Sequence, residues 1–216
     1  MYFDFVGGNR YYYSDSSIKC AASFVCQQLL DEAARLYTSK QINSNGWAGT
    51  ELNEWMNSKL FNGLPILWKQ IHRKVVIKSI RNTESGQPNV PLRQETTQSD
   101  NYFYLPALAE VNSTFNTGVY INELTSVQDG TYPVFGDSTE NTKRIKTING
   151  KPSMWWVRTP YYSDSAATST LDFFNVVRYD GKVENKTSWQ DTSVSPVKYY
   201  TFSVGTPYGI CPCFSI

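Results

Sequence analysis

Long apolar runs are missing from this sequence: no stretch approaches the roughly 18 to 20 consecutive apolar residues of a membrane-spanning helix. An excess of one charge is missing too, with 20 Lys and Arg against 19 Asp and Glu. The start, Met1 to Phe5, lacks the basic segment of a secretion signal. We therefore expect no nucleic-acid partner and no membrane insertion. A cytoplasmic protein, a phage structural protein and a piece of a longer exported chain all remain open.

Histidine is almost absent, since His72 is the only one. Any Ser-His or Cys-His nucleophile scheme must use it, but no nucleophile elbow or cysteine signature accompanies it. The neighbouring Arg73 and Lys74 lower its basicity, so we expect a surface or packing role. Acidic residues near the C-terminal loops show no spacing typical of a glycosidase pair. We expect no catalytic residue in this chain.

Cysteines are few and grouped in two close pairs, Cys20 with Cys26 and Cys211 with Cys213. These spacings miss the usual gap of about two to four residues in a zinc knuckle. A bridge from Cys211 to Cys213 would close a small, strained ring. We expect free, buried thiols, no metal ligand set and no cofactor. A disulfide across the pairs and a four-thiolate zinc site are the open alternatives.

Apolar periodicity predicts helices in the first third of the chain. The apolar positions of Ala21–Tyr37 recur at helical spacing, and Thr50–Leu60 carries a second apolar stripe that ends at Asn62-Gly63. Pro65 suits the first position of a short helix that reaches Gln70.

Short strands are predicted in most of the remainder, joined by long loops. Residues 81–100 are predicted to be a polar loop, and 112–150 a long irregular insert. Asp180-Gly181 is a strong hairpin signal. We expect the apolar last strand to lie within the core sheet. The predicted strands are Tyr2–Val6, Tyr11–Tyr13, Lys74–Ile80, Tyr102–Leu105, Trp155–Arg158, Leu171–Tyr179, Lys182–Lys186, Val197–Val204 and Gly209–Ile216.

These elements predict one α+β domain over residues 1–216, with two helices packed on a twisted antiparallel sheet. Three spaced motifs then carry a family resemblance: Gly46-Trp47 with Trp55-Met56-Asn57, next Trp155–Pro160, and last Gly209–Ile216. The chain resembles a bacterial and phage family of unassigned function whose fold is C-type lectin-like. The resemblance covers about three quarters of the chain, and residues 1–40 match it poorly. Cys211 stands where that family has Arg.

In such a fold, the loops after the Trp-Trp strand and before the last strand lie on one rim. Aromatic residues with small polar neighbours make good recognition surfaces. Alternation along a strand predicts that one of two adjacent tyrosines faces outward. The expected binding residues are Tyr161, Tyr162, Asp164, Trp189, Tyr199, Tyr200 and Tyr208.

The resemblance favours a non-enzymatic recognition or structural module of a phage virion appendage or bacterial surface protein, binding protein or glycan. Its partners would be other virion or surface proteins and host-surface glycans or proteins. We expect a homo-oligomer on the virion or cell surface. The alternative is a metal-dependent oxidase or modifying enzyme related to formylglycine-generating enzymes, with Cys211 and Cys213 on one soft metal. Arg158 is interpreted as stacking on aromatic surface and pairing with one carboxylate.

Overall fold

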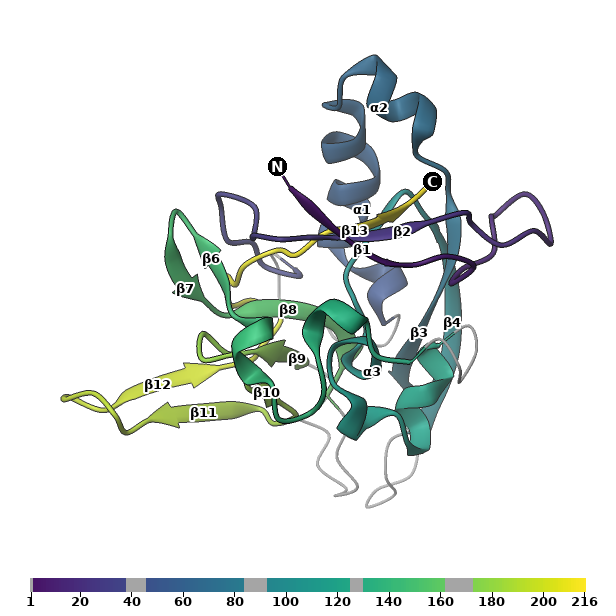
Figure 1. Cartoon of the computed structure of the whole chain (residues 1–216). Helices are drawn as coiled ribbons and strands as arrows, with labels where there is room; N and C mark the ends of the chain where they lie inside the picture. The colour runs from purple at the N-terminus through teal and green to yellow at the C-terminus, as the bar shows by residue number, and fades with distance from the viewer. Residues whose placement is uncertain (1, 38–45, 84–92, 125–129, 162–172) are drawn as a thin grey trace.

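The computed structural model describes residues 2–37, 46–83, 93–124, 130–161 and 173–216 (Figure 1). Small antiparallel sheets dominate, with short helices between them, so the predicted α+β class is confirmed. The strands are β1 Phe3–Gly7, β2 Ser23–Cys26, β3 Val75–Thr83, β4 Arg93–Asn101, β5 Phe103–Tyr104, β6 Lys146–Ile148, β7 Lys151–Ser153, β8 Trp155–Pro160, β9 Phe174–Val177, β10 Val183–Glu184, β11 Ser188–Asp191, β12 Lys198–Thr201 and β13 Cys213–Ser215.

The helices of the described residues are all short. Several are single 3-10 turns within residues 112–150, a segment that also buries aromatic side chains in the core. No helix in the described part of the chain has the length and apolarity to cross a bilayer. The helices are η2 Trp47–Gly49, α1 Glu51–Trp55, η3 Met56–Leu60, α2 Ile66–Ile71, α3 Leu108–Val111, η4 Ser113–Phe115, η5 Gly118–Glu123, η7 Pro133–Phe135 and η8 Asn141–Arg144.

The central sheet has the strand order β1-β2-β13-β5. β13 therefore pairs on both sides, with Cys213 opposite Val25 of β2 and Tyr104 of β5. The last residue adds backbone bonds, because Ala21 N donates to Ile216 O at 3.0 Å. The prediction that the last strand lies within the core sheet is confirmed.

The second sheet, β10-β9-β8, is built on the Trp-Trp motif. Every residue of β8 is buried, including both tryptophans. Each indole N–H is satisfied: Trp155 Nε1 donates to Arg144 O at 3.1 Å, and Trp156 Nε1 donates to Ala34 O at 3.0 Å. Burying two large rings with paired N–H groups gives this strand a large hydrophobic contribution at little polar cost.

The predicted helices over Thr50–Leu60 and Pro65–Gln70 are confirmed. Thr50 caps α1 by accepting from Asn53 N at 3.0 Å, and α1 continues into the π-helical turn η3. Asn57 of that turn accepts from Phe103 N and donates to Phe103 O, at 3.0 and 2.9 Å. This side chain therefore ties the helix to β5. Trp47 is buried, whereas Trp55 is partly exposed.

The predicted helix over Ala21–Tyr37 is wrong. Its first part is β2, held between β1 and β13, and the rest is an irregular segment with bonds such as Ala34 N to Tyr208 O. The buried apolar residues of this segment are Val25, Cys26, Leu29, Leu36 and Tyr37. For its first part, β1 and β13 supply the backbone partners that a helix would supply internally. Tertiary pairing therefore overrides a periodicity that also suits a helix.

The predicted loop over residues 81–100 is also wrong for its described ends. β3 runs on to Thr83, and β4 begins at Arg93, so the two form a long antiparallel ladder. The sequence of β4 is polar on both faces, and for that reason it looks like a loop. Cross-strand pairs support it, as where Arg81 Nε donates to Glu95 Oε2 at 3.0 Å.

Candidate functional site

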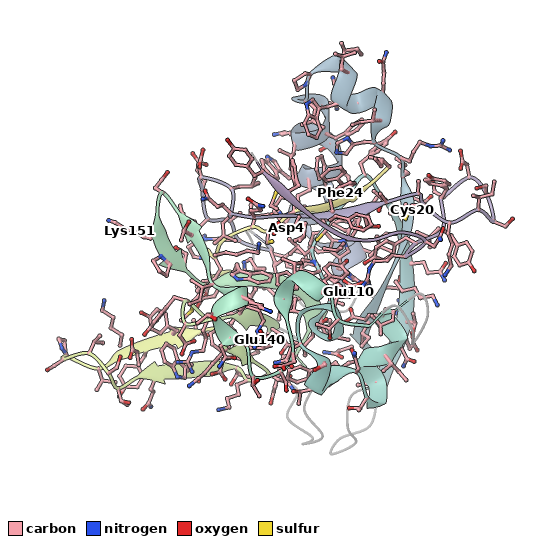
Figure 2. All side chains as sticks on the ribbon, in the orientation of Figure 1. Asp4, Cys20, Phe24, Glu110, Glu140 and Lys151 are labelled. Atoms are coloured by element: carbon pink, nitrogen blue, oxygen red, sulfur yellow. The ribbon has the colours of Figure 1, made fainter. Side chains whose placement is uncertain are left out.

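The β11–β12 hairpin is an outlying element (Figure 1), and it carries three of the predicted binding residues, Trp189, Tyr199 and Tyr200. Its two strands are antiparallel, with Trp189 opposite Tyr200 and Gln190 opposite Tyr199. Side chains project into solvent along its length (Figure 2). The strand predicted over Val197–Val204 covers only the second half of this hairpin, and β11 was not predicted.

Alternation along β12 separates the two adjacent tyrosines. Tyr199 is 74% exposed, whereas Tyr200 is half-buried. The prediction that one tyrosine of this pair faces outward is confirmed, and that residue is Tyr199. The exposed face of the hairpin therefore presents a phenol ring with Gln190 opposite it.

The other face of the hairpin is packed against the turn between β9 and β10. The rings of Trp189 and Tyr200 are stacked, with centroids 5.4 Å apart. The Arg178 guanidinium carbon lies 3.5 Å from the indole centroid, and Tyr179 meets the indole edge-on at 5.7 Å. Trp189 is thus occupied by contacts within the molecule, and it braces the hairpin.

Asp191, the last residue of β11, accepts hydrogen bonds that tie the hairpin to the residues around it. Its carboxylate accepts from the Tyr179 hydroxyl, from the Ser193 hydroxyl and from Ser193 N. The hydrogen bond from the Ser193 hydroxyl lowers the pKa of Asp191 most, and the bond from the Tyr179 hydroxyl lowers it further. The bond between Tyr179 and Asp191 in turn raises the pKa of Tyr179. A carboxylate with its lone pairs used in this way is a brace of the turn rather than a general base.

A depression of about 270 Å³ lies at the base of the hairpin. Tyr208 is buried there, with its hydroxyl donating to Thr201 O at 2.7 Å and its ring meeting Trp156 edge-on at 4.9 Å. The lining is Tyr179, Tyr200 and Tyr208 together with Ala33, Ile148, Pro152, Ser153, Met154, Pro207 and Gly209. We call the depression together with Trp189 and Tyr199 the hairpin surface.

The structure brings Trp189, Tyr199, Tyr200 and Tyr208 together in this surface. Tyr161 is half-buried at the end of β8 and does not line the depression; its N donates to Phe173 O at 3.0 Å. Tyr162 and Asp164 lie outside the described residues.

Sequence reasoning missed Arg178 and Tyr179, which hold the hairpin against the body. Their signal was their position beside the Asp180-Gly181 turn, because a tight turn brings the residues before it close to the next strands. A second depression, of about 480 Å³, lies beside α1 and is lined in part by Arg35, Trp55 and Lys59.

The four cysteines are free and buried, as predicted. Cys211 Sγ donates to Cys26 O at 3.6 Å, and burial raises the pKa of the Cys211 and Cys213 thiols. Burial therefore favours the protonated thiols, whereas a soft metal binds thiolates. Within the described ranges, no group of three or more His, Cys, Asp or Glu is arranged to hold a metal.

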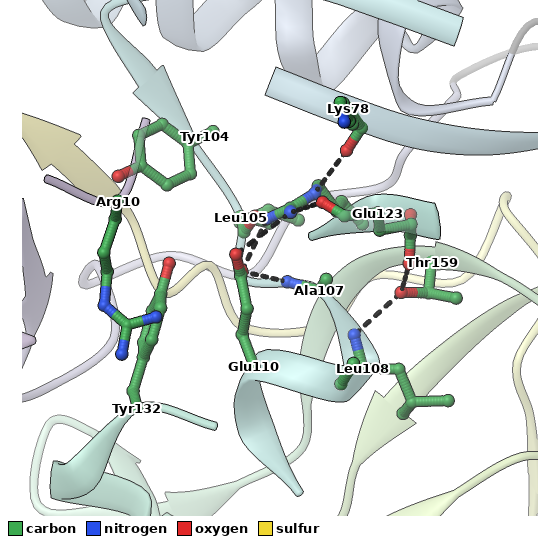
Figure 3. A network of polar contacts seen from close by, with 12 residues as sticks. Arg10, Lys78, Tyr104, Leu105, Ala107, Leu108, Glu110, Glu123, Tyr132 and Thr159 are labelled. Carbon is green, nitrogen blue, oxygen red and sulfur yellow. Dashed lines mark hydrogen bonds and ion pairs between the residues drawn. The ribbon is translucent and has the colours of Figure 1, made fainter. Parts of the chain in front are cut away.

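A buried polar network that includes Glu110, Glu123 and Thr159 (Figure 3) is held together by hydrogen bonds from Arg158. Its Nη1 atom donates to Glu110 Oε2 at 2.7 Å and to Leu105 O at 2.8 Å. Its Nε atom donates to Lys78 O at 3.1 Å, and its Nη2 atom donates to Glu123 O at 3.1 Å. The predicted pairing of Arg158 with one carboxylate is confirmed, and its other hydrogen bonds go to backbone carbonyls. The guanidinium links β8 to β3, α3 and η5.

The two carboxyl groups of this network differ in ionisation. Burial favours the neutral form of Glu110, but the Arg158 guanidinium outweighs it and holds the pKa of Glu110 below its ordinary value. Burial raises the pKa of Glu123 to about 7, although Arg158 and the Thr159 hydroxyl oppose the rise. The network is closed to solvent, so it positions strands and offers no surface to a substrate.

Fold and site together define an α+β protein built from small antiparallel sheets, with an aromatic hairpin held outside its core. A family model described as a domain of unknown function, DUF6273, matches residues 22–216, so the chain belongs to that family. No curated protein and no solved structure matches the chain.

Proposed function

We propose that this chain is a non-enzymatic recognition or structural module that binds protein or glycan through the hairpin surface. The observation that carries the proposal is the combination of an exposed ring with a rigid support. Tyr199 is 74% exposed, and the strand opposite it is fixed by the Arg178–Trp189–Tyr200 stack. A ring held in place before binding loses little conformational freedom when a ligand covers it.

The residues of the depression favour binding over catalysis. Its lining contains no acid, histidine or cysteine, and its one serine, Ser153, donates to Lys151 O at 3.0 Å. A nucleophile and a base within hydrogen-bond reach are the minimum for covalent catalysis. Three tyrosines with proline and methionine neighbours instead offer flat apolar area with polar edges, which suits sugar rings and extended peptides alike.

The proposed fold is C-type lectin-like, and the module belongs to a phage virion appendage or a bacterial surface protein. The fully buried Trp-Trp strand and the last strand paired within the central sheet support this assignment, as do the three spaced motifs. Its partners are other virion or surface proteins and host-surface glycans or proteins. Repetition in a homo-oligomer on the virion or cell surface would supply avidity.

A binding assay on intact surfaces tests the proposal. The full chain is labelled with a fluorophore. It is titrated onto intact bacterial cells, either those that encode it or those that its phage infects, and onto the phage particles. The account predicts saturable binding. Prior treatment with periodate removes it if the ligand is a glycan, and prior treatment with protease removes it if the ligand is a protein. Binding that never saturates on either surface contradicts the proposal.

A further inference from the structure

β4 is a long strand with an open edge, and it lies along one side of the molecule in Figure 1. Its ladder with β3 runs from Asn101 to Arg93 without a register shift. In the described part of the chain, β3 is the one strand that pairs with it. Open edges are usually protected by a bulge, a proline or a lysine. β4 has none of these features, so its edge is available to a further strand.

Hydrogen bonds on the far side of β3 show which backbone groups of β4 point outward. Three residues of β3 use a backbone N–H or C=O on the side away from β4: Val76, Lys78 and Ile80. These groups bond to Tyr12 O at 2.8 Å, to Arg158 Nε at 3.1 Å and to Glu123 Oε1 at 3.2 Å, respectively. Partner residues of an antiparallel ladder point their backbone groups either toward each other or both away. The ladder partners, whose backbone groups therefore point outward, are Asp100, Gln98 and Thr96.

These outward groups are free to bond to another chain. Thr96, Gln98 and Asp100 are all exposed. Among the residues that the structure describes, no hydrogen bond reaches their N–H or C=O groups. A row of unpaired backbone groups is a template for the addition of a strand. We call the outward backbone groups of these three residues the β4 edge.

The β4 edge is complementary to the same edge of a second copy of the chain. When two β4 strands run antiparallel about a twofold axis at Gln98, that residue lies opposite its own symmetry mate. Thr96 then lies opposite Asp100 of the second copy, and Asp100 opposite Thr96. Each of these pairs exchanges both of its backbone bonds, so every N–H and C=O of the β4 edge is used. A twofold contact of this kind closes after two copies.

The side chains of this register are complementary as well. The Gln98 amide both donates and accepts, so two facing amides can bond to each other, and the Thr96 hydroxyl can donate to the Asp100 carboxylate of the second copy. On the other face of the strand, Thr97 meets Ser99, a hydroxyl pair of the kind that stabilises sheets. No like charges lie directly opposite each other over residues 96–100. A register that set Asp100 against its own mate would oppose two carboxylates, so charge selects the register centred on Gln98.

We propose that the β4 edge is the dimer interface of this chain, with two copies paired antiparallel through residues 96–100. The pairing joins the two β3–β4 sheets into one sheet with the strand order β3-β4-β4-β3. The proposal rests on the proposed function only for the expectation of a homo-oligomer, and it assigns that oligomer a surface. The hairpin surface is built from other residues, so a dimer carries two hairpin surfaces and gains avidity from them.

Sedimentation velocity of the full chain, from micromolar to millimolar concentrations and without any ligand, tests the interface. We expect a reversible equilibrium in which the dimer fraction rises with concentration. Gln98→Pro removes an outward N–H that the monomer does not use, and proline is tolerated where the N–H of an edge strand faces solvent. It should raise the dissociation constant at least tenfold and leave the melting temperature nearly unchanged. A chain that stays monomeric at every concentration overturns the proposal, as does a dimer that persists in Gln98→Pro.

Two charge variants at the twofold axis test the register. Gln98→Glu and Gln98→Lys should each be monomeric, because like charges then face each other across the axis. An equal mixture of the two should form a dimer again, since opposite charges now meet. Gln190→Glu, at an exposed glutamine of the hairpin, is the control and should dimerise like the unaltered chain. A mixture that stays monomeric overturns the register centred on Gln98. These measurements use no ligand, so a failure of binding at the hairpin surface leaves them unaffected.

Discussion

Arg158 and Glu110 form an ion pair inside the core, with Nη1 and Oε2 2.7 Å apart and side chains that are 0% and 2% exposed. The pair joins the Trp-Trp strand to α3, and Glu110 also accepts from the Tyr11 hydroxyl and from Ala107 N. The ion pair therefore fixes β8 within the protein, and β8 belongs to the β10-β9-β8 sheet against which the hairpin packs.

Removing one member of the pair should be far more costly than removing both. We expect Glu110→Leu or Arg158→Met alone to lower the free energy of unfolding by about 3 to 5 kcal/mol, because each leaves a buried group unpaired. The double variant Glu110→Leu with Arg158→Met should recover part of the loss. Urea unfolding followed by circular dichroism measures this. Additive losses in the double variant would show that the two residues act independently.

Glu123 should give the stability a distinct pH dependence. Its pKa rises from the ordinary value of 4.5 to about 7 in the folded chain. Between these values the folded form binds more protons, so this residue lowers stability as pH rises from about 4.5 to about 7. Glu123→Gln should remove that decline. Unfolding free energies of both proteins at pH 5, 6, 7 and 8 test it, and parallel curves would contradict it.

Glu110 should change the free energy of unfolding in a different pH range from Glu123. Its pKa is depressed, so its contribution is complete above its ordinary value of 4.5 and is lost as pH falls through the lower folded value. Extending the unfolding measurements below pH 4.5 therefore separates the contribution of Glu110 from that of Glu123.

Gly46 should tolerate no side chain. Its φ is +57°, and an added Cβ would lie 2.3 Å from Ile80 O. Gly46→Ala should therefore lower the free energy of unfolding by clearly more than the roughly 1 kcal/mol that a positive φ alone costs. Gly118 is the matched control, with the same φ and nothing within 4 Å of an added Cβ. Equal melting temperatures for the two alanine variants would disprove the close approach.

The cysteines should be unreactive until the chain unfolds. All four are free and buried. Burial raises the pKa of Cys26 and Cys213, so few thiolates are present near neutral pH. We expect iodoacetamide to leave the native protein unlabelled and to label four thiols in urea, as counted by mass spectrometry. Labelling of Cys211 or Cys213 under native conditions would mean that those thiols open to solvent.

The elements that could be predicted from sequence are those whose local signals agree with their packing. Thr50 caps α1, Asp180-Gly181 turns the chain, and the apolar last strand is paired on both sides. β2 could not be distinguished from a helix, because its neighbours β1 and β13 are distant in sequence. β4 could not be distinguished from a loop, because both of its faces are polar.

The candidate site was only partly predictable for a similar reason. Adjacent tyrosines on a strand had to face opposite ways, and Tyr199 and Tyr200 do. Sequence alone could not show that Arg178 covers the Trp189 ring, because that contact crosses from one hairpin to another.

The most direct test of the recognition account is the binding of Tyr199→Ala to the cells or particles that bind the unaltered chain. Tyr199 is largely exposed, so its loss should leave the melting temperature nearly unchanged and weaken binding at least tenfold. Tyr12→Ala, at a partly exposed tyrosine outside the hairpin, should bind like the unaltered chain. Full binding by Tyr199→Ala, or equal losses in both variants, would contradict the account.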